Sequence, residues 1–317
     1  MRLLILGARG FIGSAVARRA VATGWTVGAA CRRSTPGARL ADFEPSLETL
    51  HAELADASEI TRLVTDWRPD AIVQAAFAAG HGTDDASGRS DYFQRGIAPA
   101  LALALALETT RYQGTLVHAG SAMSFGDTGR PHAADDRLAP TTPRGVVKAA
   151  CSLIYEQACR SAGFRLCELF IYSVYGPWEQ RDRLIPGLLR ATLDGGTIRL
   201  TPAGHLRNWV HVDDVAKACL AAAARTPAGA SRVIVGSDRS VATTHEVARL
   251  IEAIAGRPLV SDYTLPVTDR YGDEHLSFDP APGLATIGWA PAIELPSGLR
   301  TTWEWAATPA GQRHLLA

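Results

Sequence analysis

The chain begins with the pattern that constrains its fold most. An apolar run at 3–6 predicts a buried strand, and a glycine loop follows it directly, before a helix-like segment at 11–23. In a loop of this kind the first glycine permits a tight turn, the second lets the backbone approach a pyrophosphate, and the third allows close packing of helix on strand. Phosphates then bind at the helix N-terminus, where free N–H groups and the helix dipole favour negative charge. The sequence therefore predicts dinucleotide binding through Gly7, Arg9, Gly10, Phe11, Ile12 and Gly13.

Strand-like and helix-like segments alternate through the first half of the chain. Apolar runs of strand length cover residues 3–6, 26–30, 71–75, 115–118 and 166–171. Helical periodicity is found between them, at residues 11–23, 59–67, 97–109 and 146–162. This alternation predicts an α/β fold, a Rossmann-like doubly wound parallel sheet with helices on both faces.

The second half differs in character after Gly176-Pro177, where glycine, proline and loop residues become frequent. Short strands are predicted at 198–201 and 208–211, and the segment 233–236 is expected to return to the main sheet. From Pro258 onward, a segment that contains Tyr263, Tyr271 and Trp289 predicts a compact lid.

These features predict two domains. Residues 1–172, rejoined by 207–238, would bind the dinucleotide, and residues 173–206 and 239–317 would form a smaller C-terminal substrate-binding domain. The cleft between the two is the expected binding site.

Composition excludes several classes of partner. Lys plus Arg and Asp plus Glu both total 32, so the chain has no basic field that would recruit nucleic acid. The apolar stretch 98–107 is too short to span a bilayer, and no signal peptide is visible at Met1-Arg2. The five cysteines lack metal-ligand spacing, which favours reduced thiols in a cytoplasmic protein.

The end of the second predicted strand indicates which dinucleotide is bound. NAD enzymes commonly place a carboxylate here for the adenosine ribose, where it would repel a 2′-phosphate. This chain has Arg32, Arg33 and Ser34 instead, which can form charge-assisted hydrogen bonds to a phosphate. The alternative is that both arginines are solvated surface residues. We expect NADPH/NADP, with Arg9 as a third positive contact.

Further segments carry a family resemblance. Residues 118–127 resemble the Ser-Ser-x-x-x-Tyr-Gly-Asp segment of the extended short-chain dehydrogenase/reductases, 172–177 resemble Phe-Asn-Val-Tyr-Gly-Pro, and 207–216 resemble Arg-Asp-Tyr-Val-His-Val-Asp-Asp-Val-Ala. The resemblance covers nearly the whole chain. It implies cofactor contacts at Glu53, Leu54, Ala75, Ala76, Phe77, Ala119, Lys148, Tyr172 and Val174.

One departure from this family dominates the functional interpretation. Residues 142–148 resemble the Tyr-Gly-x-Ser-Lys stretch, but Arg144 stands in the place of the tyrosine, four residues before Lys148. Hydride transfer to a carbonyl leaves an oxyanion that needs a proton, and a guanidinium stays protonated throughout the accessible pH range. Ser173 also replaces an asparagine that touches the diphosphate in sugar-nucleotide enzymes, whereas Arg207, the other diphosphate contact, is kept.

The remaining candidates leave the proton donor open. The resemblance implies Ser121, Lys148 and Tyr172 as catalytic residues, although Ser121 would equally satisfy nearby backbone. Tyr155 favours core packing, and His81 and His118 are either ordinary polar residues or acids. Substrate contacts are expected at Ser121, Arg144, Tyr175 and Trp178, with solvent exposure the alternative for Arg144.

No metal is expected. His211, Asp213 and Asp214 are residue types that bind metals, but they lie in a segment that is structural in the family it resembles. Members of the family it resembles often dimerise through two helices per subunit, and the segment 146–162 is compatible with such a homodimer interface and equally with a buried helix.

Three functions follow from these observations. A substrate with an acidic phenol beside its ketone would protonate its own alkoxide, and an extended reductase without the tyrosine resembles the atypical ketoreductases of angucyclinone (simocyclinone-type) antibiotic biosynthesis. That resemblance implies NADPH-dependent reduction of one ketone of an aromatic polyketide. The alternatives are a nucleotide-sugar 4-ketoreductase or epimerase with a relocated acid, and a non-catalytic NADP-binding sensor.

Overall fold

The computed structural model describes residues 1–35, 37–77, 86–201, 206–264 and 281–316. Its main sheet has seven strands in the order β10-β6-β5-β4-β1-β2-β3, and all its pairings are parallel. The strands are β1 (Arg2–Leu6), β2 (Thr26–Cys31), β3 (Glu48–His51), β4 (Ala71–Gln74), β5 (Thr115–Ala119), β6 (Arg165–Ile171) and β10 (Ala230–Val235). The predicted doubly wound parallel sheet is confirmed.

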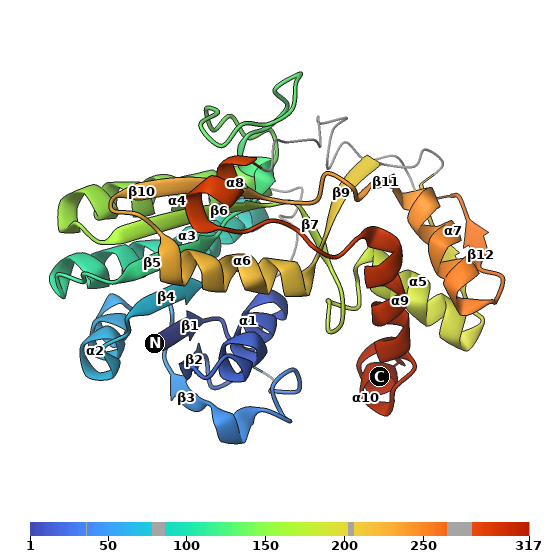
Figure 1. The fold of residues 1–317 in the computed structure, drawn as a ribbon, viewed down its shortest axis with the longest axis horizontal. Helices are drawn as coiled ribbons and strands as arrows, with labels where there is room; N and C mark the ends of the chain where they lie inside the picture. The colour runs from blue at the N-terminus through green and yellow to red at the C-terminus, as the bar shows by residue number, and fades with distance from the viewer. Residues whose placement is uncertain (36, 78–85, 202–205, 265–280, 317) are drawn as a thin grey trace.

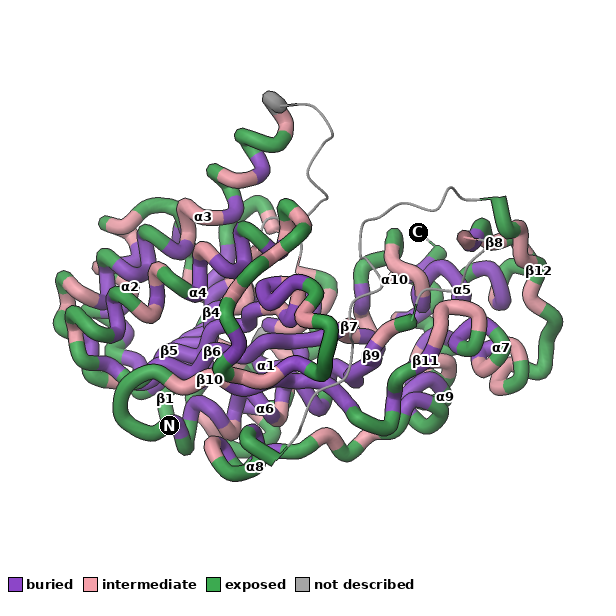
Figure 2. Tube along the Cα trace, turned by 90° about the horizontal axis from the view of Figure 1, so that it is seen from above, coloured by how far each residue is buried: buried purple, intermediate pink, exposed green. Residues whose placement is uncertain are grey.

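Helices cover both faces of this sheet (Figure 1). On one face, α1 (Phe11–Ala22) and α6 (Val212–Arg225) pack against each other and against the strands. On the other face lie α2 (Ala57–Trp67), α3 (Ala86–Thr109) and α4 (Pro143–Ala162). Apart from the edge strands β3 and β10, the strands are buried on both sides, so their sequences are almost continuously apolar (Figure 2).

The second group of elements lies beyond one end of the main sheet (Figure 1). It contains a three-stranded sheet of β11 (Val241–Thr243), β9 (Leu206–His211) and β7 (Ser173–Tyr175), and a pair formed by β12 (Val260–Asp262) and β8 (Thr197–Arg199). Its helices share a separate apolar core and are α5 (Leu184–Asp194), α7 (Thr244–Ala255), α9 (Leu295–Ala306) and α10 (Pro309–Leu316).

Local sequence explains where several helices begin. Asp56 caps α2 by accepting the backbone N–H groups of Ser58 and Glu59. Thr243 and Glu246 form a complete capping box at the start of α7. These caps satisfy first-turn amides that have no partner within the helix. By contrast, the Gly10 N-cap of α1 supplies no side-chain acceptor.

One part of the predicted lid belongs elsewhere. Helix α8 (Ala281–Ile287) packs against β10 and α6, and the indole N–H of the buried Trp289 donates to the Asp214 carbonyl at 3.0 Å. This segment therefore covers the main sheet, because its apolar residues join the core on that face. Tyr271 lies outside the described residues.

Two short helical turns complete the fold, η1 (Glu44–Ser46) and η2 (Ala122–Ser124). Turn η2 follows β5 directly, at the carboxyl end of the main sheet. In an open α/β sheet this edge is where ligands bind. The candidate site is therefore sought along it.

Candidate active site

Steric contacts define the glycine loop. Gly7 has a φ of +85°, and a Cβ built on it would lie 2.7 Å from the Ala76 backbone. A Cβ on Gly13 would lie 2.2 Å from the Gly7 carbonyl oxygen. The loop therefore lets backbone approach backbone as a dinucleotide fold requires, and Phe11 and Ile12 open a helix that no side chain caps.

A cavity of about 570 Å³ lies at the carboxyl ends of β2 and β3. Three predicted cofactor residues from the β2 end line it together with Glu53 from the β3 end; the full lining is Arg32, Arg33, Ser34, His51, Ala52, Glu53, Glu59 and Arg62. Arg9 approaches this region from the glycine loop, since its guanidinium donates to the Thr35 carbonyl at 2.8 Å. Leu54 is buried in the adjacent core.

The other end of the candidate site, beside the carboxyl end of β5, is built around Lys148. Its ammonium donates to the Ala119 carbonyl at 2.7 Å and lies 4.4 Å from the centre of the Phe77 ring. Arg144 covers the same ring, with its Cζ 5.2 Å from the ring centre. Burial, with a smaller contribution from the nearby Arg144 charge, lowers the pKa of Lys148 to about 8. A cation cluster thus occupies the place where the family pattern has a tyrosine.

Ser121 has a structural task in this arrangement. It is the N-cap of η2, and its hydroxyl accepts the Met123 backbone N–H at 3.3 Å. Its side chain is only half-buried, and its second lone pair and its proton are not used by this contact. Both the capping role and a substrate contact remain compatible with its position.

Tyr172 is tied to a histidine that sequence reasoning missed. The His132 Nε2 lies 3.0 Å from the Gly126 carbonyl, which only accepts, so this nitrogen carries the proton. Nδ1 is then the acceptor for the Tyr172 hydroxyl at 2.7 Å. Burial lowers the pKa of His132 and keeps the ring neutral. No periodic pattern marks His132 in the sequence, since it lies in the irregular segment between η2 and α4.

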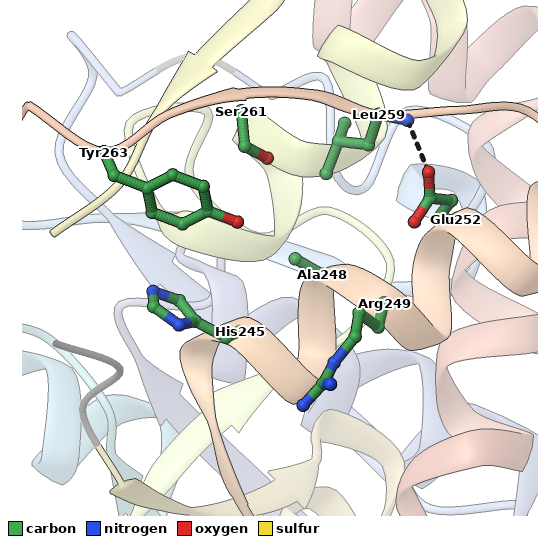
Figure 3. A pocket seen from close by; sticks show the side chains of 7 residues that line it. All are labelled: His245, Ala248, Arg249, Glu252, Leu259, Ser261 and Tyr263. Atoms are coloured by element: carbon green, nitrogen blue, oxygen red, sulfur yellow. Dashed lines mark hydrogen bonds between the residues drawn. The ribbon is translucent and has the colours of Figure 1, made fainter. Parts of the chain in front are cut away.

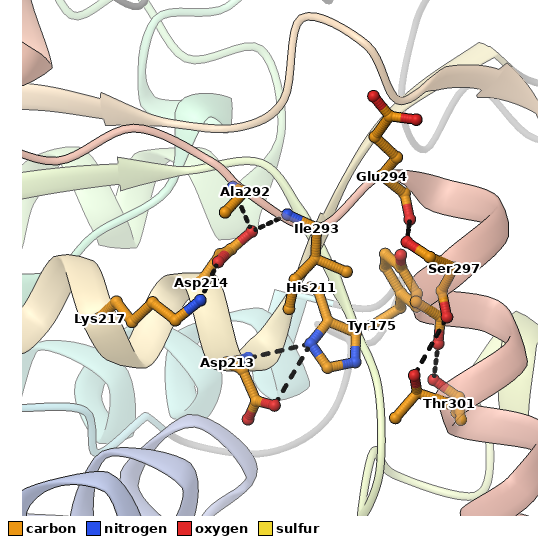
Figure 4. A network of polar contacts seen from close by, with 12 residues as sticks. Tyr175, His211, Asp213, Asp214, Lys217, Ala292, Ile293, Glu294, Ser297 and Thr301 are labelled. Atoms are coloured by element: carbon orange, nitrogen blue, oxygen red, sulfur yellow. Dashed lines mark hydrogen bonds and ion pairs between the residues drawn. The ribbon is translucent and has the colours of Figure 1, made fainter.

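The interpretation of Tyr175 as a substrate contact is wrong for its side chain. Tyr175 is fully buried in the core of the second group of elements, and its ring packs edge-on to Trp209 and His211. Its hydroxyl lies 3.5 Å from the Leu295 carbonyl. Figure 4 shows it between His211 and α9, where it contributes to packing.

Trp178 also packs within the protein. Its φ is +72°, and its ring contacts Trp305 and His314 of the C-terminal helices. The Trp178 carbonyl accepts from the Arg39 Nε at 2.9 Å, which ties it to the segment after β2. Only its half-exposed part remains for a ligand. Val174, by comparison, is half-buried beside the α1 face of the core.

A second buried polar cluster lies beneath Lys148. The Glu168 Oε2 is 2.7 Å from the His118 Nδ1 and accepts from the Ser152 hydroxyl at 2.9 Å. Tyr155 is fully buried, as its expected core packing requires, and its hydroxyl accepts from the Gln74 amide at 3.2 Å. His118 and Tyr155 are therefore engaged in internal contacts, and His81 lies outside the described residues.

The acidic residues after β9 hold the two parts of the chain together. Asp214 accepts from Lys217 and from the backbone N–H groups of Ala292 and Ile293, and the His211 Nδ1 accepts from the Asp213 N–H (Figure 4). Within the described ranges, no group of three or more His, Cys, Asp or Glu residues is placed to hold a metal ion. The five cysteines, all in the described part, form no disulfide bond and are buried.

Another cavity, of about 410 Å³, lies away from this edge, between α7 and residues 259–263 (Figure 3). His245 and Arg249 face it from the helix, and Ser261 and Tyr263 face it from the opposite side. None of the predicted site residues lines it, so we assign it no role in the reaction. Separately, no described helix is long and apolar enough to cross a membrane.

The fold and the glycine cradle define a dinucleotide-binding α/β protein. Residues 3–236 match the model of the NAD dependent epimerase/dehydratase family, and the chain belongs to this family. Among curated relatives, it is 28% identical to a dTDP-glucose 4,6-dehydratase of Mycobacterium tuberculosis, with 96% of this chain and 93% of the relative covered. It is 25% identical to the enzyme of that name from Salmonella typhimurium, with 96% and 92% covered.

Solved structures share the fold over the same extent. A Thermus thermophilus UDP-glucose 4-epimerase in complex with NAD superposes with a TM-score of 0.83 at 24% identity, covering 97% of this chain and 100% of that one. A Streptomyces venezuelae dTDP-glucose 4,6-dehydratase with NAD bound gives 0.82 at 24% identity, with 98% of both chains covered. The extended short-chain dehydrogenase/reductase architecture is thereby confirmed.

Proposed function

We propose that this protein is an NADPH-dependent ketoreductase whose substrate, a phenolic polycyclic ketone of the aromatic polyketide (angucyclinone-like) type, supplies the proton itself. The observation that carries this proposal is Arg144 at the tyrosine position, stacked with Lys148 on the Phe77 ring. Two cations there stabilise negative charge on a reacting oxygen. Arg144 is permanently charged and does not act as an acid.

The residues along the sheet edge suit a nicotinamide dinucleotide. The glycine loop opens a helix whose N-terminus no side chain caps, where phosphates would bind, and Lys148 donates to the Ala119 carbonyl at the far end, where it would hold the nicotinamide ribose. When bound, this cofactor supplies a hydride to the carbonyl carbon. In this proposal Ser121 would donate a hydrogen bond to the carbonyl oxygen, while Arg144 and Lys148 would stabilise the developing oxyanion.

The proton is then the remaining requirement. A phenol beside the ketone has a pKa of about 10, far below that of an aliphatic alcohol, and lies within hydrogen-bond reach of the alkoxide. The enzyme's task reduces to alignment, which alone lowers a barrier by about 7 kcal/mol or more. In this scheme the chain needs no tyrosine.

A second candidate is a nucleotide-sugar 4-ketoreductase or epimerase with a relocated acid. The relatives named dTDP-glucose 4,6-dehydratase favour it, and so does the kept Arg207. Tyr172, whose hydroxyl donates to the His132 Nδ1, offers a replacement acid, which would give its proton to the substrate oxygen and recover one from solvent. Tyr172→Phe would abolish turnover in this scheme and change it little in the first.

NADPH consumption with two ketones in parallel tests the proposal. We expect turnover of a phenolic polycyclic ketone and none of a nucleotide 4-keto-sugar. Turnover of the sugar alone would replace the first candidate by the second. If neither reacts although NADPH binds, the protein is a non-catalytic NADP sensor.

We also propose that the protein forms a homodimer through α3 and α4. These helices pack against each other, and Leu101, Leu105 and Leu153 are each about half exposed on them. Exposed leucines of this kind on neighbouring helices favour a protein partner. Light scattering should give twice the chain mass, and Leu105→Lys with Leu153→Lys should give the single chain mass.

A further inference from the structure

The cavity at the adenosine end contains an arginine that the glycine-loop and strand-end patterns do not identify. Arg62 lies on the second turn of α2, thirty residues after Arg32, yet both line the same cavity of about 570 Å³. His51 lines it as well, from the end of β3. Three separate elements therefore bring basic side chains to one hollow.

The side chains of the three arginines of this cavity have no hydrogen-bond or ion-pair partner among the described residues. Within the described part of the chain, Arg32, Arg33 and Arg62 neither donate a hydrogen bond nor form an ion pair, whereas Arg9, Arg18 and Arg39 donate to backbone carbonyls. The three arginines are solvent-exposed, so no folding role explains their convergence.

The carboxylates of the cavity have other partners or roles. Glu59 accepts the Glu53 backbone N–H at 2.8 Å through its Oε2, which orients it towards the start of α2. Asp56, just outside the cavity, is held by Ser58 and Glu59, and hydrogen bonding to Ser58 lowers its pKa; Arg62 lies within range of its charge. The family resemblance implies that Glu53 contacts the adenine, so its expected role is apart from phosphate binding.

We propose that Arg62 is a specificity-determining residue that binds the 2′-phosphate of NADP(H) together with Arg32 and Arg33. The inference rests on the proposed preference for NADPH and extends it to a residue of α2. A phosphate with close to two negative charges at neutral pH matches three convergent guanidinium groups, whose planar forks bind phosphate oxygens in pairs. A bare ribose hydroxyl, as in NAD(H), gains little from this third cation.

Binding measurements test the inference without turnover. NADPH and NADH would be titrated into the wild-type protein, Arg62→Gln and the control Arg190→Gln, an exposed arginine of α5 that loses the same charge. We expect Arg62→Gln to weaken NADPH binding by about tenfold or more, the effect of one lost charge-assisted contact, and to change NADH binding less than twofold. Arg190→Gln should match wild type for both.

A smaller probe isolates the adenosine end. Adenosine 2′,5′-bisphosphate and AMP contain the ribose with and without the 2′-phosphate, and neither contains nicotinamide. We expect Arg62→Gln to lose affinity only for the bisphosphate, and expect salt to weaken bisphosphate binding less in the variant than in the wild type.

The outcomes separate the inference from the proposed function. If the wild type prefers NADPH and Arg62→Gln keeps that preference, or loses both cofactors equally, Arg62 is not the determinant although the NADPH preference stands. If the wild type binds NADH as tightly as NADPH, the cofactor preference fails and the inference with it. Neither result depends on which ketone is reduced.

Discussion

The two ends of the candidate site, the glycine loop and the surroundings of Lys148, differ in how strictly backbone contacts determine their residue types. At Gly7 and Gly13 of the glycine loop, added Cβ atoms would lie 2.7 and 2.2 Å from backbone atoms, so sterics require glycine at both positions. At Lys148 the ammonium donates to one backbone carbonyl, that of Ala119, but its other neighbours are side chains, namely Phe77, Arg144 and a buried polar cluster. Side chains change without loss of the fold, so the glycine loop is kept here while position 144 departs from the family pattern.

A substitution in the glycine loop should have the largest effect on cofactor binding. Gly13→Ala places a Cβ 2.2 Å from the Gly7 carbonyl, so the loop has to shift and NADPH binding should fall by at least about 100-fold. Gly187→Ala in α5 meets only the Ile198 Cδ1 at 3.3 Å and serves as the matched control. Isothermal titration of NADPH checks both, and normal binding by Gly13→Ala would refute the steric account.

Removal of Lys148 should separate activity from stability. Burial opposes the Lys148 charge, so Lys148→Met should melt no lower than wild type, while kcat/KM falls by about 100-fold because ribose and oxyanion contacts are lost. Melting curves and steady-state kinetics of the same preparation provide the measurement. A variant that loses stability and activity together would indicate a structural lysine.

Restoration of a tyrosine sharpens the comparison further. Arg144→Tyr supplies an acid four residues before Lys148, so it should enable reduction of a ketone whose neighbouring phenol is methylated, by about tenfold or more over wild type. With the free phenol it should bring no comparable gain. Equal behaviour of both substrates in both proteins would show that position 144 does not face the reacting oxygen.

The smallest effect is a pH dependence at the Lys148 end. With a folded pKa of about 8, the ammonium is present at pH 7 and is lost as pH rises through 8, so kcat/KM should decline there. The sign for stability is opposite: between pH 8 and about 10.5 the unfolded chain binds more protons, so folding is favoured as pH rises. Lys148→Arg should remove most of the decline in kcat/KM above pH 8. An unchanged decline in this variant would assign the titration to another group.

Much of the fold could be predicted because the buried parallel strands are apolar runs with few exceptions. Strands β1, β2, β4, β5 and β6 and helices α1 and α4 were expected within a few residues of their observed bounds. Strand β3 was missed because Glu48–His51 is a mostly exposed, polar edge strand with no apolar run. Helix α3 begins before the predicted segment 97–109, and it contains Pro99.

Side-chain partners across the fold were less predictable. Position along β6 and β7 placed Tyr172 and Tyr175 near the site, but their side chains point to His132 and into the second core, and only tertiary packing decides this. Arg62 and His132 carry no motif, since each acts through proximity to residues distant in sequence. The glycine loop was predictable because its function depends on the backbone itself.

The central claim is that the substrate provides the proton. Its most direct test is the single-turnover rate of NADPH oxidation with a phenolic polycyclic ketone and with the same ketone methylated at the neighbouring hydroxyl. We expect reduction of the phenol and a loss of at least about 100-fold for the methyl ether at comparable affinity. Equal rates for the two ketones would contradict the account and place the proton donor in the protein.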